Sequence, residues 1–483
     1  MYRRRISAVT VSTDLFQIEP LQEYFSCLAL VCGVPQSRMM QLKILIEEVF
    51  SHTVEKCFLG KNDAQITVSA DVTLSSFILT FSFQGLPFSY DLEKSETEDD
   101  EVSLHLIRTL SSTYRMKEDG KRGQSIEISL ALTPKAIDEN PVEEPVHKPA
   151  PDEKVELRQV RAEEMEKMVQ CLYKVFGYTY SAEAIYYPDL LRERLAGGLY
   201  KGFVAVNPKG DIVAHSAMLK DSAQASICEC GQAFVSPEYE HRGLFIKLKT
   251  MLMEEADKIG LRGVYSSAVT GHPYTQMANV RLGCVETGLE LSYIPNNLKS
   301  VIHRDGEEQR QTVMSFFKPT SHQKPLEVYV PEKHKDIIEA TYRHLSLERA
   351  LAIPDVTSLP DENSDIEEVA KTEWNQLHIH ILKAGNDLDS RIRRIIRRAM
   401  ANGIAVAYIS LDMTDPQTPA IINILEGEGF IYSGIMPYEC NDCDSIRMQF
   451  ISDSNLNPDY IIAHTEWGNE LKNYIMKQLQ NVE

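Results

Sequence analysis

The stretch from residue 227 to residue 260 constrains the fold more than any other part of the chain. It begins with Ile227–Val235, which is apolar enough to form a strand, and the turn that follows ends on Arg242 and Gly243. A helical spacing of apolar residues then runs to Gly260, a typical helix stop. The first amides of a helix have no partner within it, and the helix dipole favours negative charge there. The stretch therefore predicts a strand, a turn and a helix whose N-terminus binds an anion such as a phosphate.

The length and charge of the chain limit its organisation and its partners. A chain of 483 residues is too long for one hydrophobic core, so about two to four domains are expected. The formal net charge of −20 argues against nucleic acid or an anionic membrane surface as the main partner. No apolar run approaches the length of a membrane span, and the nine cysteines are scattered as in a reducing compartment. We expect a soluble, cytoplasmic, prokaryotic protein that binds neither nucleic acid nor membrane.

The turn and its flanks, Pro237-x-Tyr-x-His-Arg-Gly-Leu-Phe-x-x-Leu248, resemble the acyl-CoA pyrophosphate loop of the GNAT N-acetyltransferase family. The family pattern is Arg/Gln-x-x-Gly-x-Gly/Ala. Gly243 matches its central glycine, with Glu240 at the Arg/Gln position and Phe245 at the second glycine. The order of elements predicted for residues 155–317 also resembles this family. The resemblance implies an N-acyltransferase that binds acetyl-CoA through the strand end and the turn, at Phe234, Val235, Arg242, Gly243, Leu244 and Phe245.

Acyl transfer to an amine benefits from a group that takes the proton of the amine. Glu229 lies on the strand before the turn, where the resemblance places the general base, and a carboxylate among apolar neighbours is costly to bury without a task or a partner. A carboxylate paired with a neighbouring strand residue is the alternative, with equal weight. The tyrosine acid of the family corresponds to Asn279, so Tyr274, earlier on the same predicted helix, is the substitute candidate.

The first 133 residues predict a separate α/β sandwich, in which helices are followed by a mostly antiparallel sheet. Their motifs resemble the GHKL-type ATP-binding domain of anti-sigma-factor serine kinases. Ile46-Glu-Glu-Val-Phe-Ser-His52 stands at the Glu-x-x-x-Asn box of that family, and Gln84-Gly-Leu-Pro-Phe88 at the end of its Asp-x-Gly-x-Pro-Phe box. Residues 104–110 resemble the helix after its lid, and residues 122–124 its terminal Gly-Asn turn.

Several residues depart from the ATP site of that family. His52 replaces the Mg²⁺-binding Asn, Phe83 replaces the Asp that would bind the adenine amino group, and Glu101 and Ser103 replace two lid glycines. Glu48, the catalytic base of the family, is retained. We therefore interpret the domain as a pseudo-ATPase that binds a regulatory partner or acts as a scaffold, with ATP and Mg²⁺ not expected to bind and no metal site predicted. The vestigial nucleotide site consists of Glu48, His52 and Gly85.

The second half of the chain begins after a linker. Residues 134–154 contain five prolines and a mostly acidic charge run, which is typical of an extended tether. Residues 321–483 resemble a second, degenerate GNAT lobe, because residues 404–437 parallel residues 264–295 in order and spacing. Residues 384–387, Ala-Gly-Asn-Asp, stand where the pyrophosphate loop would be, so no CoA site is expected in this lobe.

Three weaker signals in the second half are assigned structural roles. Cys440 and Cys443 have no second Cys or His pair at zinc spacing, so we expect a thiol pair and not a metal site. His378 and His380 share a strand face but have no third ligand that the sequence identifies. The arginines of residues 391–398 lie opposite an apolar helical stripe and are expected to be a solvated or acid-paired face.

The predicted fold class is α/β (α+β), with a GHKL-like sandwich at 1–133, a linker at 134–154, a GNAT domain at 155–320 and a degenerate GNAT-like lobe at 321–483. The leading function is acyl transfer from acetyl-CoA to an amine, which could belong to a protein, with the first domain regulating or recruiting. The alternative is a non-catalytic regulatory protein of a bacterial, anti-sigma-like signalling pathway, and the third candidate is an ATP-dependent serine kinase. The acceptor, the acyl chain and the oligomeric state are left open.

Overall fold

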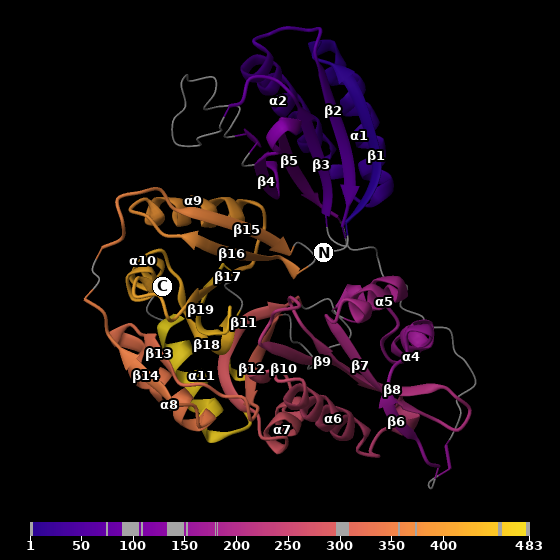
Figure 1. The fold of residues 1–483 in the computed structure, drawn as a ribbon, viewed down its shortest axis with the longest axis vertical. Helices are drawn as coiled ribbons and strands as arrows, with labels where there is room; N and C mark the ends of the chain where they lie inside the picture. Colours follow the sequence, from indigo (N-terminus) through magenta and orange to yellow (C-terminus); the bar gives the residue numbers. More distant parts are fainter. Residues whose placement is uncertain are drawn as a thin grey trace. The chain divides into compact units, whose positions relative to one another are not determined.

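A computed structural model gives the structure, drawn as a ribbon in Figure 1. It describes residues 3–73, 76–88, 106–107, 110–132, 149–150, 153–178, 180, 182–295, 309–355, 358–371, 374–452 and 456–479. Its contacts divide the chain into two compact units: the first holds residues 1–136, 368–378 and 394–405, and the second holds residues 137–367, 379–393 and 406–483. Glu101, Ser103 and most of the predicted linker lie outside the described residues.

The first unit is built on a five-stranded antiparallel sheet with the order β1-β2-β3-β5-β4. Its strands are β1 (Arg4–Ser12), β2 (Gln65–Val72), β3 (Ser76–Phe83), β4 (Thr113–Glu118) and β5 (Gln124–Ala131). The helices α1 (Ile18–Cys32) and α2 (Met39–Phe58) bury their apolar residues with those of the sheet in one cluster. α1 ends because Gly33 adopts a left-handed φ of 102° and closes the last turn. Helices on an antiparallel sheet are the arrangement that the sequence predicts.

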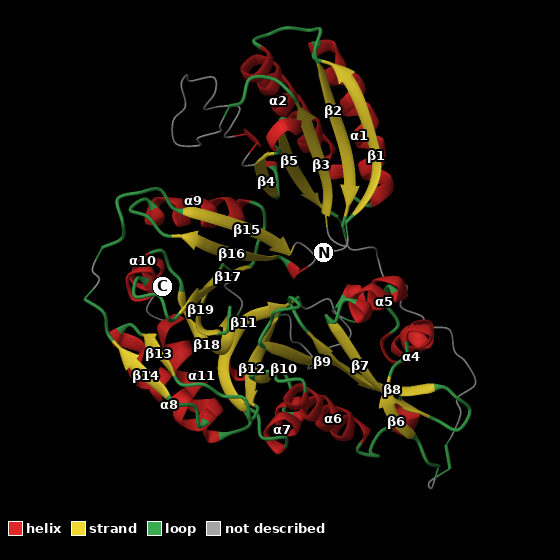
Figure 2. Cartoon of the chain, viewed as in Figure 1, coloured by secondary structure: helices red, strands yellow, loops and turns green. Residues whose placement is uncertain are grey.

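The second unit contains most of a large mixed sheet, shown by secondary structure in Figure 2. The strands of its first half are β6 (Glu156–Gln159), β7 (Tyr200–Val206), β8 (Ile212–Leu219), β9 (Ile227–Val235), β10 (Gly263–Val269), β11 (Val285–Ile294) and β12 (Gln311–Pro319). Its helices are α4 (Met165–Phe176), α5 (Pro188–Ala196), α6 (Leu244–Lys258) and α7 (Tyr274–Arg281). These elements alternate along the chain, which confirms the α/β class.

The second half of the chain extends the same sheet. Its strands are β13 (Leu326–Tyr329), β14 (Arg349–Ala352), β15 (Asp365–Lys371), β16 (Gln376–Lys383), β17 (Val406–Asp412), β18 (Ile431–Cys440) and β19 (Cys443–Ile451). Its helices are α8 (Lys335–Leu345), α9 (Leu388–Ala401), α10 (Thr418–Gly427) and α11 (Glu466–Leu479). The strand order of the twelve-stranded sheet is β15-β16-β17-β19-β18-β11-β12-β10-β9-β8-β7-β6, and β13 and β14 form a separate parallel pair.

The centre of the sheet repeats one arrangement twice. β10, β12 and β11 are neighbours in one half, β17, β19 and β18 repeat this order in the other, and α7 and α10 follow the equivalent strands β10 and β17. The halves join where β11 pairs with β18 through Gly288 and Gly434. A Cβ added to Gly434 would lie 2.3 Å from the Cα of Gly288, so the two backbones approach closely because neither residue has a side chain. The repeat has the order that the parallel between residues 264–295 and 404–437 predicts.

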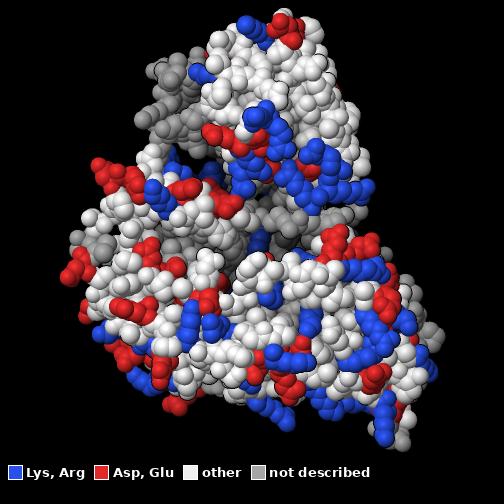
Figure 3. Space-filling view, viewed as in Figure 1, with Lys and Arg blue, Asp and Glu red and all other residues white. Residues whose placement is uncertain are grey.

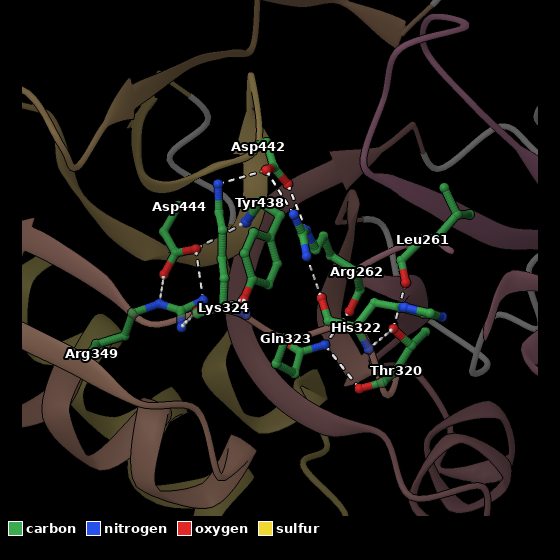
Figure 4. Close-up of polar contacts among 10 residues, drawn as sticks. All are labelled: Leu261, Arg262, Thr320, His322, Gln323, Lys324, Arg349, Tyr438, Asp442 and Asp444. Atoms are coloured by element: carbon green, nitrogen blue, oxygen red, sulfur yellow. Dashed lines mark hydrogen bonds and ion pairs between the residues drawn. The ribbon is translucent and has the colours of Figure 1, made fainter. Parts of the chain in front are cut away.

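A polar network fixes the hairpin of β18 and β19 to β14, to Lys324 before β13 and to Arg262 before β10 (Figure 4). Arg349 and Asp444 form an ion pair of 2.6 Å whose side chains are 1% and 0% exposed. Asp442 accepts hydrogen bonds from Arg262 at 3.0 Å and from Lys324 at 2.6 Å. Burial acts to raise the pKa of Asp442, but these hydrogen bonds outweigh it and lower the pKa to about 2. Removing one partner of a buried ion pair costs about 3–5 kcal/mol, so the network strongly favours this one placement of the hairpin.

Two of the weaker sequence signals can be placed in the structure. Arg393 on α9 pairs with Glu428 at 2.5 Å, as expected of an acid-paired helix face. Cys440 and Cys443 face each other across the β18–β19 hairpin and are free thiols. Figure 3 shows basic and acidic side chains interspersed over the visible face of the second unit. No helix in the described part of the chain has both the length and the apolar character needed to cross a membrane.

The contact of Gly288 with Gly434 predicts a position-specific loss of stability. Gly434→Ala places a Cβ 2.4 Å from the carbonyl oxygen of Thr287 at a φ of 145°, so the backbone of the joint must shift. We expect a loss of about 1–3 kcal/mol, seen as a lower unfolding midpoint in urea. Gly427→Ala is the matched control, because a Cβ added to this residue meets nothing within 4 Å. Equal midpoints for the two variants would contradict the importance of the joint.

Candidate functional site

β9 and β10 pair in parallel over a short distance and then separate. The pairs are Ile227 with Gly263, Cys228 with Val264, and Glu229 with Tyr265. Both strands continue, β9 to Val235 along β8 and β10 to Val269 along β12. The facing edges beyond Glu229 and Tyr265 therefore make no ladder with each other, and their backbone groups can hydrogen-bond an extended ligand. We call this opening, between residues 229–235 and residues 265–269, the fork.

β9 contains a β-bulge within the fork. Its register with β8 shifts between His215 and Ala217, and Gln232 adopts a φ of 48°. The His215 ring supports the bulge, because Nδ1 donates to the Gln232 carbonyl at 2.8 Å and Nε2 accepts from the Tyr200 hydroxyl at 2.7 Å. Burial lowers the pKa of His215 to about 4, which keeps the ring neutral. A bulge leaves backbone groups of the extra residue outside the ladder, so this one can present an amide to a ligand in the fork.

The turn after β9 leads into a helix N-terminus with open space in front of it. Gly243 precedes α6 with a φ of 72°, and the first helical hydrogen bond runs from the Lys247 amide to the Gly243 carbonyl. The amides of residues 243–246 thus have no partner within the helix. A Cβ added to Gly243 would meet nothing within 4 Å. This is the geometry that an anion cradle requires, with the exposed Glu240 as a nearby carboxylate.

The other residues predicted to bind the acyl donor have different surroundings. Phe234 and Leu244 are buried in the core, so only their backbone atoms can contact a ligand. The Arg242 guanidinium donates to the carbonyls of Ala150 and Glu153 at 2.8 Å and 3.2 Å. Its hydrogen bonds therefore attach the turn to the segment before β6. The predicted contact of Arg242 with an anion stays a prediction.

Glu229 lies on one face of the fork, which is open to solvent. The Ser266 side chain faces α6, so Tyr265 and its parallel partner Glu229 point to the opposite face. Ser267, on the same face as Tyr265, is exposed although it lies in a central strand. Glu229 is half-buried, and its Oε1 lies 2.7 Å from where a Cβ on Gly231 would be. Burial and the charge of Glu229 raise the pKa of the Tyr265 hydroxyl. The role of Glu229 as a general base stays a prediction.

A buried lysine lies on the other face of the fork. Lys249 on α6 is 2% exposed, and its Nζ donates to Ser266 Oγ at 3.0 Å and to Asn279 Oδ1 at 2.8 Å. The ring of Phe245, one helical turn earlier, lies 5.3 Å from this ammonium group. Sequence reasoning missed Lys249 and set Asn279 aside because it cannot donate an acid proton. The one available signal was the place of this lysine directly after Leu248, on the apolar side of the predicted helix.

The predicted acid Tyr274 is the first residue of α7 and is 68% exposed. Its ring lies 5.2 Å from the ring of His272, which is half-buried. α7 brings two buried polar residues to β10: Asn279, which accepts from Lys249, and Gln276, which donates to the Val269 carbonyl at 3.3 Å. The acid role of Tyr274 stays a prediction. Among the residues that the structure describes, no group of three or more His, Cys, Asp and Glu side chains is arranged to hold a metal ion.

The residues predicted to form the vestigial nucleotide site are packed closely in the first unit. Phe83 stacks on Phe88 with ring centroids 6.0 Å apart, and the buried His52 lies 6.1 Å from the same ring. A Cβ added to Gly85 would lie 2.4 Å from a sulfur atom of α2, so this glycine is required by packing. Glu48 is half-buried one helical turn before His52. The aromatic surroundings of His52 do not suit a hard cation such as Mg²⁺.

Comparisons with known proteins give low similarity. No protein-family model and no curated protein matches this chain. The spermidine/spermine N-acetyltransferase of Vibrio cholerae is 14% identical, covering 35% of this chain and 96% of its own, with a TM-score of 0.28. The ribosomal-protein-S18-alanine N-acetyltransferase of Escherichia coli is 15% identical, with coverages of 35% and 95% and a TM-score of 0.28. Both are acetyltransferases, but similarity at this level decides neither the fold nor the function of this chain.

The buried His215 predicts a pH-dependent stability. Its pKa is about 4 in the folded protein and near 6.5 in an unfolded chain, so the unfolded state binds more protons between these values. Stability should be full above pH 6.5 and fall by up to about 1.4 kcal/mol per pH unit as the pH falls towards 4. His215→Gln should reduce this slope by one proton, as measured by urea unfolding at several pH values. An unchanged slope would contradict the neutral, buried ring.

Proposed function

We propose that this protein transfers an acyl group from acyl-CoA to an amine. The observation that carries the proposal is the fork, because three features that acyl transfer needs lie in it or directly after it in the chain. They are the bulge at Gln232, the α6 N-terminus at Gly243 and the carboxylate of Glu229. Together they provide backbone donors, an anion cradle and a base within one short stretch of chain.

The fork fits the chemistry of a CoA thioester, which supplies an activated acyl group. The exposed edges of β9 and β10 would hydrogen-bond an extended chain, and the amides of residues 243–246 would hold a pyrophosphate. An amide released by the bulge at Gln232 would donate to the thioester carbonyl and stabilise the negative charge that develops on its oxygen. The open space before Gly243 leaves room for the phosphates.

Glu229 would act as the general base. An amine attacks as a neutral nucleophile, so a protonated amine must first lose a proton, directly or through water, to a nearby acceptor. Glu229 is half-buried on the solvent-open face of the fork, and the backbone of β9 fixes its position beside the bulge. The amine acceptor would therefore approach from this face, while the acyl donor lies between the strands.

The first unit would regulate or recruit and would not hydrolyse ATP. The support for this part is the packed set of His52, Phe83 and Phe88. A second candidate function is a non-catalytic regulatory protein. It is favoured by the carboxylate of Glu240 beside the helix N-terminus and by the engagement of Arg242 with backbone carbonyls.

Binding of acetyl-CoA provides the first test. Gly243→Trp would place a large side chain before the α6 N-terminus, so micromolar binding to the wild type should be lost in calorimetry. Gly260→Trp is the matched control, because this residue lies beyond the other end of α6 with a similar φ of 79° and equally open space. Absence of binding to the wild type would overturn the acyltransferase proposal in favour of the regulatory candidate.

Removal of the base provides the second test. Glu229→Gln should lower kcat by about 10²–10⁴-fold, because the amine loses its proton acceptor, while acetyl-CoA affinity stays within about threefold. The assay is release of the CoA thiol with the amine that a screen against the wild type identifies. Glu254→Gln, at an exposed carboxylate of α6, is the control and should keep the wild-type rate. A wild-type kcat for Glu229→Gln would exclude this residue as the base.

The first unit has a test of its own. We expect calorimetric titration with ATP and Mg²⁺ to show no submillimolar binding, since the rings around His52 leave a poor site for the cation. Submillimolar affinity would contradict the pseudo-ATPase interpretation and revive the serine kinase candidate.

A further inference from the structure

The ammonium group of Lys249 is buried without a carboxylate among its hydrogen-bond partners in the described part of the chain. It is 2% exposed, and its hydrogen bonds go to the neutral oxygens of Ser266 and Asn279. A buried lysine is costly unless an opposite charge compensates it. This residue therefore provides a site for a negative charge that the chain itself does not supply through those contacts.

Lys249 is also placed where the fork begins. Ser266 directly follows Tyr265, which belongs to the last residue pair between β10 and β9. On β9, Cys230 directly follows Glu229, which is the residue paired with Tyr265. Ser266 and Cys230 are therefore the first residues beyond the last pair on each strand. The hydrogen bond to Ser266 holds the ammonium group against β10, on the face to which Cys230 also points. Burial raises the pKa of the Cys230 thiol, and the charge of Lys249 acts in the opposite direction. It stands at the closed end of the fork, on the face opposite Glu229.

We infer that Lys249 stabilises the thiolate that leaves when the acyl group is transferred; this inference rests on the proposed function. In that step the amine nitrogen forms a bond to the acyl carbon, the carbon–sulfur bond breaks, and its electron pair goes to sulfur. The ammonium form of the amine first loses one proton, which Glu229 passes to solvent, and after the attack the nitrogen loses a second proton, which Glu229 keeps. The sulfur keeps its negative charge as an ion pair with the Lys249 ammonium group, and Lys249 needs to transfer no proton.

The neighbours of Lys249 act as positioning residues. Ser266 on β10 and Asn279 on α7 accept two of its three N–H groups and leave the third for the sulfur. The role of Asn279 in holding Lys249 explains why an Asn stands where the resemblance implies a proton-donating Tyr. A fixed cation replaces a proton donor, because an ion pair lowers the pKa of a thiol and makes the thiolate a better leaving group.

The test compares CoA with desulfo-CoA, an analogue that lacks the sulfur, by calorimetry at pH 8.5. Each unit by which the site lowers the thiol pKa is worth about tenfold in thiolate affinity, so a fall of about two units should make the wild type bind CoA at least about tenfold more tightly than desulfo-CoA at this pH. Lys249→Met should reduce this ratio to about one, with desulfo-CoA affinity within about threefold of the wild type. Lys258→Met, at an exposed lysine of the same helix, should keep the ratio.

The outcomes separate this inference from the proposed function. A wild-type ratio near one, or an unchanged ratio in Lys249→Met, overturns the inference, while micromolar binding of desulfo-CoA still supports the CoA site. If the wild type binds neither compound, the proposed function fails, and the inference fails with it. The wild-type ratio is informative even if Lys249→Met does not fold, which its thermal unfolding curve will show.

Discussion

The separation of β9 from β10 is the constraint on which the candidate site depends. Each strand keeps a partner on its other side, β8 or β12, so the two edges can diverge without unravelling the sheet. The helix after each strand then lies beside the opening, α6 after β9 and α7 after β10. Residues 229–235 thereby carry the carboxylate and the bulge, and α6 supplies a helix N-terminus and the buried Lys249 on the face opposite Glu229.

The two halves of the large sheet share a strand order but differ in their polar side chains. β10, β12 and β11 correspond to β17, β19 and β18, and the halves touch through Gly288 and Gly434. In the first half, β9, which forms one side of the fork, leads through a glycine turn into α6. The second half supplies the strands that extend the sheet and the hairpin carrying Asp442 and Asp444, which pair with cations of other elements.

The first unit has its own hydrophobic cluster and sheet, and chemically it contrasts with the fork. At the fork, polar groups surround an opening, with Glu229 on one face and Lys249 on the other. In the first unit, His52 and Phe83 both lie against the ring of Phe88, and Gly85 packs against α2.

The sequence alone determined those helices and strands that the residue pattern of a single segment specifies. Ile227–Val235 and the start of α6 followed from apolar spacing and from Gly243, and Glu229 followed from a charge within an apolar strand. β12, β14, β15 and α11 were not predicted, although β12 contains buried apolar residues and the buried residues of α11 include Trp467, Leu471 and Ile475 at helical spacing. The bulge at Gln232, its support by His215 and the burial of Lys249 were decided by tertiary structure. Each depends on atoms of strands or helices distant in sequence, and no spacing within one segment encodes which face a neighbour will cover.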